Sequence, residues 1–102
     1  IFKKMIKRIV KLTFRDDEIE TFLVNFEKNK LRIRNFAGCC HLELWRDKNH
    51  SNIFFTYSFW ESEDKLNTYR HSELFKNVWS KTKILFSEKP QAWSIDSVWE
   101  GE

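Results

Sequence analysis

The stretch IFFTYSFW, residues 53–60, is apolar in both of the alternating positions that a β-strand directs to opposite faces of a sheet. One set is Ile53, Phe55, Tyr57 and Phe59, and the other contains Phe54 and Trp60. A strand in an antiparallel sheet with one solvated face should alternate between apolar and polar residues. We therefore expect both faces to be covered, one by helices of the same chain and the other by a second copy of it.

Other elements follow from this strand in both directions along the chain. The patterns predict strands at residues 5–14, 39–47, 53–60 and 92–99, and helices from Asp16–Asp17 to before Asn35, from Ser62, and from Ser72 to before Pro90. The polar tract 48–52 is expected to be a hairpin loop. The order βαββαβ predicts a ferredoxin-like α+β fold, in which an antiparallel sheet has its helices on one face.

The ends of the helices carry recognisable signals. Asp17 and Glu20 have the spacing of a capping box, and Ser62 and Ser72 are expected to cap the two later helices. Gly38 is expected to supply the turn after the first helix. The apolar stripe of the last helix is predicted to include Leu74, Phe75, Val78, Trp79, Thr82, Leu85 and Phe86.

The size of the chain predicts a single domain. The sequence has 102 residues, and we interpret residues 5–102 as one domain and residues 1–4 as an N-terminal extension, with Met5 as a candidate natural start. Ten Phe, five Trp and two Tyr are a heavy aromatic content for a domain of this size. Some of these rings are therefore expected to line a pocket or an oligomer interface.

Several functional classes do not fit the composition. No apolar run approaches the length of a membrane span, and no signal peptide is evident, so we expect a cytoplasmic protein without a membrane partner. The adjacent Cys39 and Cys40 predict no disulfide framework, and no Cys/His spacing predicts a metal site. The net charge of +3 comes from interspersed charges. An RNA-recognition module shares the βαββαβ order but needs glycines and a basic residue that residues 52–57 lack, so we expect no nucleic acid partner.

Three short stretches carry a resemblance to a known family. They are RNFAGC at residues 34–39, WESE at residues 60–63, and YRHSELF at residues 69–75. Over about residues 5–99 the chain resembles the antibiotic biosynthesis monooxygenase family. The resemblance implies a homodimer whose two sheets close into a dimeric α/β barrel, with a pocket in each protomer between the sheet and its helices. It also implies a monooxygenase that needs no cofactor and oxidises a small electron-rich aromatic or quinol with dioxygen.

The resemblance also places candidate site residues. His71 borders the implied pocket, and histidine is the residue type best suited to acid–base catalysis near neutral pH; Tyr69 is the second catalytic candidate. Trp60, Phe75 and Trp79 are candidates for substrate binding. The alternatives are a solvated or capping role for His71 and plain core packing for the aromatic residues. His41 shares the parity of Glu43 and is expected to face the second copy.

Two further expectations concern function. Haem-degrading relatives carry an iron-ligating His where this chain has Trp79, their distortion-promoting Trp falls at Tyr69, and their first-strand Asn falls at Val10, so haem degradation by that route is not expected. The alternative to a monooxygenase is a non-catalytic dimeric module of the same fold that binds a small ligand. The sequence does not decide between these two functions.

Overall fold

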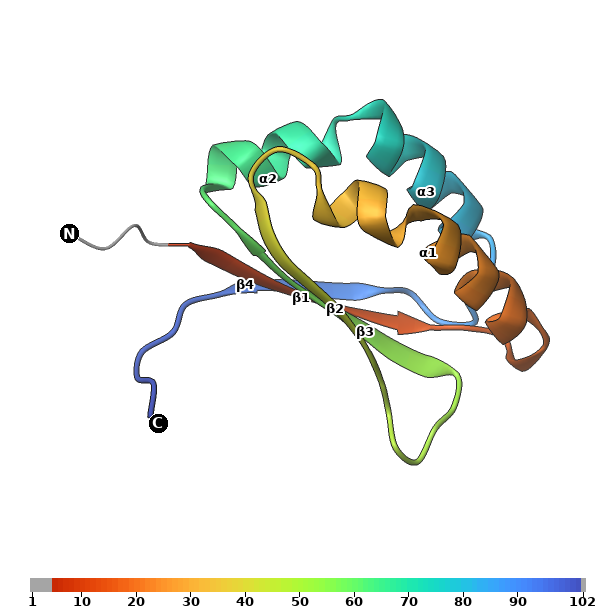
Figure 1. Cartoon of the computed structure of the whole chain (residues 1–102). Coiled ribbons are helices and arrows are strands. Elements are labelled where there is room, and N and C mark those ends of the chain that lie inside the picture. The colour runs from red at the N-terminus through yellow and green to blue at the C-terminus, as the bar shows by residue number, and fades with distance from the viewer. Residues whose placement is uncertain (1–4, 102) are drawn as a thin grey trace.

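The computed structural model describes residues 5–101, which form one sheet and one layer of helices (Figure 1). In chain order the elements are β1 (Ile6–Thr13), a 3₁₀ turn (Asp16–Glu18), α1 (Ile19–Arg34), β2 (Cys39–Arg46), β3 (Ile53–Trp60), α2 (Glu63–Arg70), α3 (Glu73–Lys83) and β4 (Gln91–Ile95). The expected N-terminal extension, residues 1–4, lies outside the described residues. No helix in the described part is long and apolar enough to cross a membrane.

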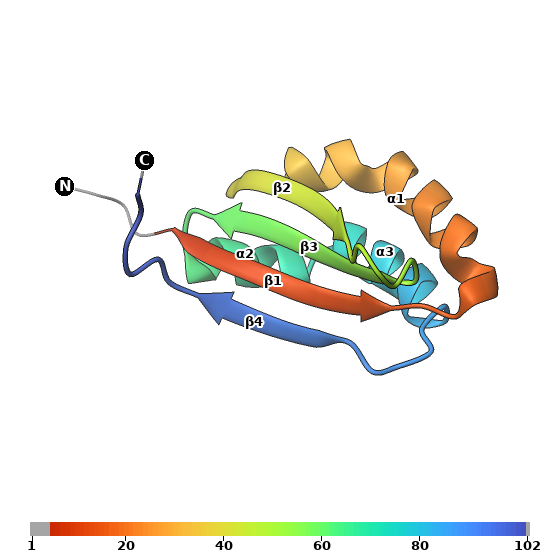
Figure 2. The same cartoon turned by 90° about the horizontal axis from the view of Figure 1, so that it is seen from below.

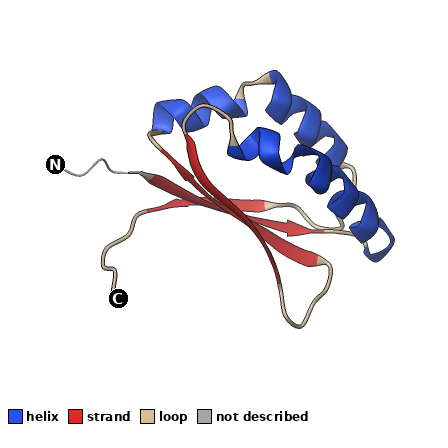
Figure 3. Ribbon diagram, in the orientation of Figure 1, coloured by secondary structure: helices blue, strands red, loops and turns tan. Residues whose placement is uncertain are grey.

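The four strands form one antiparallel sheet in the order β2-β3-β1-β4. All three α-helices lie on the same face of this sheet, as seen from two directions (Figures 2 and 3). No helix of residues 5–101 covers the opposite face, so the sheet of a single chain is open. The predicted ferredoxin-like α+β fold is confirmed, and its second helical segment is divided into α2 and α3.

The side chains at the two ends of β3 hold the helices over the sheet. Phe54 and Trp60 are each 2% exposed, and each belongs to a buried cluster. The Phe54 cluster consists of Leu12, Phe14, Phe22, Phe54 and Leu85, and the Trp60 cluster consists of Cys39, Trp60 and Leu66. Full burial of a large apolar side chain contributes roughly 1.5–3 kcal/mol. The two clusters therefore fix the helix layer at two separate places.

The start of α1 differs from the prediction, whereas the starts of the later helices agree with it. Asp16 and Asp17 lie in the 3₁₀ turn, and α1 begins after Glu18 without a side-chain cap, so the predicted capping box is wrong. The acidic side chains of the turn still precede the positive end of the α1 dipole. Ser62 accepts a hydrogen bond from the Lys65 N–H at 3.2 Å, and Ser72 accepts one from Phe75 at 3.1 Å, which confirms both predicted caps.

The C-terminal elements are shorter than predicted. The last helix, α3, ends at Lys83, and Phe86 forms an isolated β-bridge with Phe14 instead of a further helical turn. The 4% exposed Leu85 still reaches the core, so its apolar character signalled burial rather than helix. The last strand spans Gln91–Ile95 rather than residues 92–99, and Trp99 is 83% exposed.

The uncovered side of the sheet, which we call the outer face, carries large apolar side chains. Its residues pair across the strands in three rows, which are His41–Phe59–Lys7–Ile95, Glu43–Tyr57–Ile9–Trp93 and Trp45–Phe55–Lys11–Gln91. Trp45 stacks on Tyr57 with 4.6 Å between ring centroids, and its indole N–H donates to the Glu43 carboxylate at 2.8 Å. Trp45 and Trp93 are 39% and 46% exposed. His41 lies on this face, as its parity predicted.

The turn between α1 and β2 requires glycine. Gly38 has φ of +93°, and a Cβ atom at this position would lie 2.5 Å from Lys65 Cβ in α2. The Gly38 carbonyl also accepts a hydrogen bond from the Glu61 N–H at 2.9 Å, which limits how far the backbone can shift. This turn therefore joins the start of β2 to the end of β3 and to α2.

We predict that Gly38→Ala lowers the free energy of unfolding by about 1–3 kcal/mol, because alanine is strained in this backbone conformation and contacts Lys65. Denaturant titration measures the change. Lys65→Ala is the control and should be near neutral, because this residue is exposed. Lys65→Ala combined with Gly38→Ala should keep most of the loss, since the two Cβ atoms still collide. Wild-type stability of Gly38→Ala would contradict the assignment.

Candidate functional site

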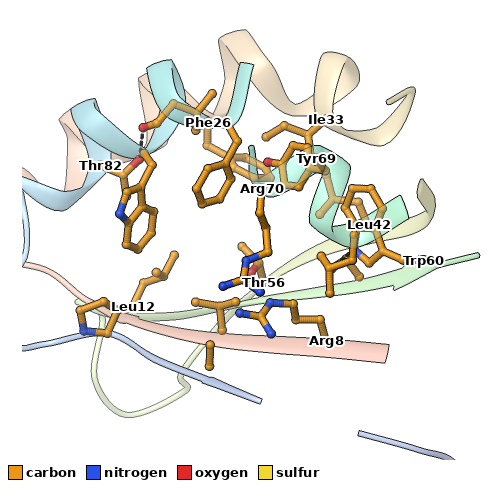
Figure 4. Close-up of a pocket in the computed structure, with 18 of the residues that line it drawn as sticks. Arg8, Leu12, Phe26, Ile33, Leu42, Thr56, Trp60, Tyr69, Arg70 and Thr82 are labelled. Atoms are coloured by element: carbon orange, nitrogen blue, oxygen red, sulfur yellow. Dashed lines mark hydrogen bonds between the residues drawn. The ribbon is translucent and has the colours of Figure 1, made fainter. Parts of the chain in front are cut away.

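A cavity of about 440 Å³ lies between the sheet and the helices (Figure 4). Rings from all three helices line it, among them Phe22 and Phe26 from α1, Tyr69 from α2, and Phe75 and Trp79 from α3. A volume of this size is within the range of small-molecule sites, which are commonly lined by apolar and aromatic side chains with a few polar groups.

Short side chains of β3 and β4 near the centre of the sheet leave this space. The two central rows on the helix-facing side are Leu42–Ser58–Arg8–Ser94 and Leu44–Thr56–Val10–Ala92. The helices rest on the Phe54 cluster at one end of β3 and on the Trp60 cluster at the other. Between these clusters β3 supplies only Thr56 and Ser58, so the helix layer stands above a gap that no side chain of β3 fills.

The structure brings together every residue that the sequence marked as a candidate for this site. The residues Trp60, Tyr69, His71, Phe75 and Trp79 all line the cavity. They come from β3, α2, the junction after α2, and α3. Their position at one cavity is a finding, whereas their catalytic and binding roles stay predictions.

Tyr69 lies in an aromatic stack at one end of the cavity. Its ring stacks on Trp60 with 4.8 Å between centroids and meets the edges of Phe36 and Phe75, each at 5.3 Å. Burial, with a smaller contribution from Cys39, raises the pKa of the Tyr69 phenol well above its ordinary value. The phenol is therefore protonated at neutral pH and can donate a hydrogen bond. None of the described residues forms a hydrogen bond with its hydroxyl group.

His71 lies at the rim of the cavity, directly after α2. Its Nδ1 is 2.7 Å from the Asn67 carbonyl oxygen. Because a carbonyl can only accept, Nδ1 carries the proton, and in the neutral ring Nε2 keeps a free lone pair. The His71 backbone N–H also donates to Asn67, at 3.1 Å. His71 thus closes the last turn of α2, the capping role considered above, while its second ring nitrogen can still accept a proton.

Phe75 and Trp79 belong to both the cavity wall and the core. Their rings are nearly parallel, with 5.9 Å between centroids, and Trp79 also contacts Phe86 at 5.6 Å. Each is partly buried and packs along the inner surface of α3. The two alternatives from the sequence, core packing and pocket lining, therefore apply to the same side chains.

Sequence reasoning missed two arginines at this cavity, Arg8 and Arg70. Arg8 has the same parity as Val10 and Leu12 in β1, so a charged side chain on the buried side of that strand was the available signal. Its Nη1 donates to Ser94 Oγ at 3.2 Å. Burial, and next the charge of Arg70, lower the pKa of Arg8 from its ordinary value. The cavity therefore contains two positive groups close enough to affect each other.

The two cysteines and the loop residue His50 do not line the cavity. Within residues 5–101 there is no group of three or more His, Cys, Asp or Glu side chains that could hold a metal ion. Cys39 and Cys40 are free thiols, and burial raises the pKa of Cys39, which disfavours its reactive thiolate. His50 pairs with Asp47 in the loop between β2 and β3.

Several solved structures share this fold at low sequence identity. An antibiotic biosynthesis monooxygenase superposes with a TM-score of 0.86 at 16% sequence identity, covering 91% of this chain and 98% of the other. A conserved protein from Methanosarcina mazei Go1 gives 0.87 at 13% identity, with coverages of 92% and 93%. A protein from Mycobacterium tuberculosis gives 0.86 at 14% identity, with coverages of 96% and 99%. At these identities the likeness shows the fold alone.

The sequence itself also matches a family model. No curated protein matches the chain. The model described as antibiotic biosynthesis monooxygenase matches residues 5–79, which include β1, both strands of the β2–β3 hairpin, and every candidate residue at the cavity. The match covers well over half of the sequence, and the chain therefore belongs to the antibiotic biosynthesis monooxygenase family.

Proposed function

We propose that this protein is a cofactor-independent monooxygenase that acts on a small electron-rich aromatic or quinol. The observation that carries the proposal is the ring-lined cavity of about 440 Å³, with the protonated phenol of Tyr69 and the ring of His71 on its wall. Family membership supports an oxidative function. The fold alone hosts many functions, so the choice of reaction rests on the cavity.

The proposed reaction begins with removal of a proton from the substrate. His71 Nε2 accepts this proton, and the Tyr69 hydroxyl donates a hydrogen bond to the substrate oxygen that becomes negative. The resulting anion reduces dioxygen and bonds to it, which gives a peroxide anion that takes the proton back from His71 and becomes a hydroperoxide. The hydroperoxide then loses water and leaves a new carbonyl group. One oxygen atom ends in the product and the other in water, and the substrate supplies all the electrons, so no external reductant is needed.

We also propose that the protein works as a homodimer joined through the outer face. Trp45, Tyr57, Phe59 and Trp93 form a contiguous apolar surface there, next to Ile9 in the centre of the sheet. Exposed apolar surfaces of this kind are typical of protein interfaces. A second copy has the same apolar surface and can cover it with two-fold symmetry.

The free thiols Cys39 and Cys40 support the further proposal of a cytoplasmic location, where thiols stay reduced.

We predict oxygen uptake with members of a hydroquinone and anthrone panel, and a loss of turnover when the acid–base groups are removed. His71→Ala should lower kcat by about 10²–10⁴-fold, as expected for loss of a general base. Tyr69→Phe keeps the ring stack and should lower kcat without changing the melting temperature substantially. His50→Ala, in the β2–β3 loop and outside the cavity lining, is the matched control. Unchanged turnover in both cavity variants would remove the acid–base assignment, and binding without oxygen uptake by the wild type would indicate a non-catalytic module.

We predict that haem forms no stoichiometric histidine-ligated complex, because Trp79 occupies the place of the ligand in haem-degrading relatives. A haem titration followed at the Soret band measures this. Trp79→His is the informative variant, since it restores a ligand on the cavity wall and should produce a ligated spectrum. A histidine-ligated spectrum from the wild-type protein would show that the cavity is used differently.

We predict a dimer at micromolar concentration, with an interface above roughly 2,000 Å² in total. Ile9→Glu places a charge at the centre of the outer face and should shift the sedimentation coefficient to that of a monomer. Val24→Glu is the control, because Val24 is a 50% exposed apolar residue on α1 and should leave the dimer intact. Sedimentation of the wild-type protein as a monomer would refute the proposed assembly.

A further inference from the structure

Arg8 and Arg70 enter the cavity from opposite walls. Arg8 lies in β1 of the sheet. Arg70 is the last residue of α2, and its side chain extends towards the sheet (Figure 4). Both side chains line the cavity. Arg8 is partly buried and Arg70 is exposed, so the pair lies where the apolar interior opens to solvent. The two guanidinium groups therefore face a shared space near the mouth of the cavity.

No carboxylate of the described chain balances this pair. None of the residues 5–101 that line the cavity is Asp or Glu. The ion pairs found between described residues do not involve Arg8 or Arg70. The proximity of Arg70 contributes to the lowered pKa of Arg8, as expected for two like charges near each other in a partly desolvated place. An anion between the two guanidinium groups would relieve that repulsion.

The position of Arg8 is fixed in a way that suits a binding group. Its strand pairs it with Ser58 on one side and Ser94 on the other, and its Nη1 donates to Ser94 Oγ at 3.2 Å. The remaining N–H groups of its guanidinium have no hydrogen-bond partner among the described residues. A guanidinium presents several donors in a planar arrangement that matches a carboxylate. Arg8 can thus hold an anion without first breaking its contact with β4.

We propose that the cavity binds an aromatic substrate that carries a carboxylate, with the carboxylate between Arg8 and Arg70 and the ring system among Phe26, Phe75 and Trp79. This inference rests on the proposed function, because it assigns the substrate class of the same cavity. His71 directly follows Arg70 in the chain. An anion held by Arg70 therefore anchors the substrate beside the group that removes its proton.

The test measures binding separately from turnover. An anthraquinone carboxylate and its uncharged carboxamide are stable probes of nearly equal shape, and quenching of tryptophan fluorescence or calorimetry gives their dissociation constants. The wild-type protein should bind the carboxylate at least about tenfold more tightly than the carboxamide. Arg70→Met should weaken carboxylate binding by about 10–100-fold and leave carboxamide binding nearly unchanged. Arg70→Lys should recover part of the loss, since it keeps the charge without the planar donors.

Two further variants complete the design. Arg32→Met, on the exposed surface of α1, removes the same charge outside the cavity and should leave both constants unchanged. Arg8→Met should also weaken carboxylate binding; if it destabilises β4, Arg70→Met alone decides the question. Equal affinity for the two probes, or equal losses in Arg32→Met and Arg70→Met, would overturn the proposal. Carboxylate selectivity without oxygen uptake would refute the monooxygenase and leave the anion site, whereas oxidation of quinols without charge preference would refute only the anion site.

Discussion

The strict alternation of side-chain direction along β3 is the constraint on which the other features of the molecule depend. The strand lies between β2 and β1, so both of its backbone edges are hydrogen-bonded to neighbouring strands. Its even-numbered side chains face the helices, and the odd-numbered Phe55, Tyr57 and Phe59 lie on the outer face. A shift of one residue in register would exchange the two sets and expose Trp60 and Phe54. One strand thereby sets both the cavity on the inner side and the apolar surface on the other.

Different residues of the same strand stabilise the core and line the cavity. Phe54 and Trp60 at its ends carry the buried clusters, whereas Thr56 and Ser58 at its centre leave the cavity open. The Trp60 indole N–H donates to Ser58 Oγ at 3.0 Å, so the hydroxyl that borders the cavity also holds a ring of the core in place. The gap is therefore a regular consequence of small residues between large ones. A cavity produced in this way does not require a strained backbone or a separate loop.

Much of the fold was predictable because its signals are local. Each of these signals depends on a few neighbouring residues: the caps at Ser62 and Ser72, the turn at Gly38 and the strand at residues 53–60. The structure agrees with all of them. The capping box of Asp17 and Glu20 was wrong because the acidic residues form a 3₁₀ turn instead. At the site, His71 and the aromatic residues were found through the family resemblance. The Arg8–Arg70 pair was not, because it joins residues from separate elements and depends on how α2 lies over the sheet.

The edge strand β4 contributes side chains to both faces of the sheet, and all five of its residues are exposed. Ala92 lines the cavity, whereas Trp93 and Ile95 pair with Ile9 and Lys7 on the outer face. Within the described chain, β4 is hydrogen-bonded as a strand only to β1. A second copy packed on the outer face would bury Trp93 and restrict the motion of β4. Ser94, which receives the hydrogen bond from Arg8, lies on that same strand. Assembly on one face would thus hold in place a wall of the cavity and Ser94, the hydrogen-bond partner of the partly buried Arg8. This physically connects the proposed dimer to the proposed substrate site.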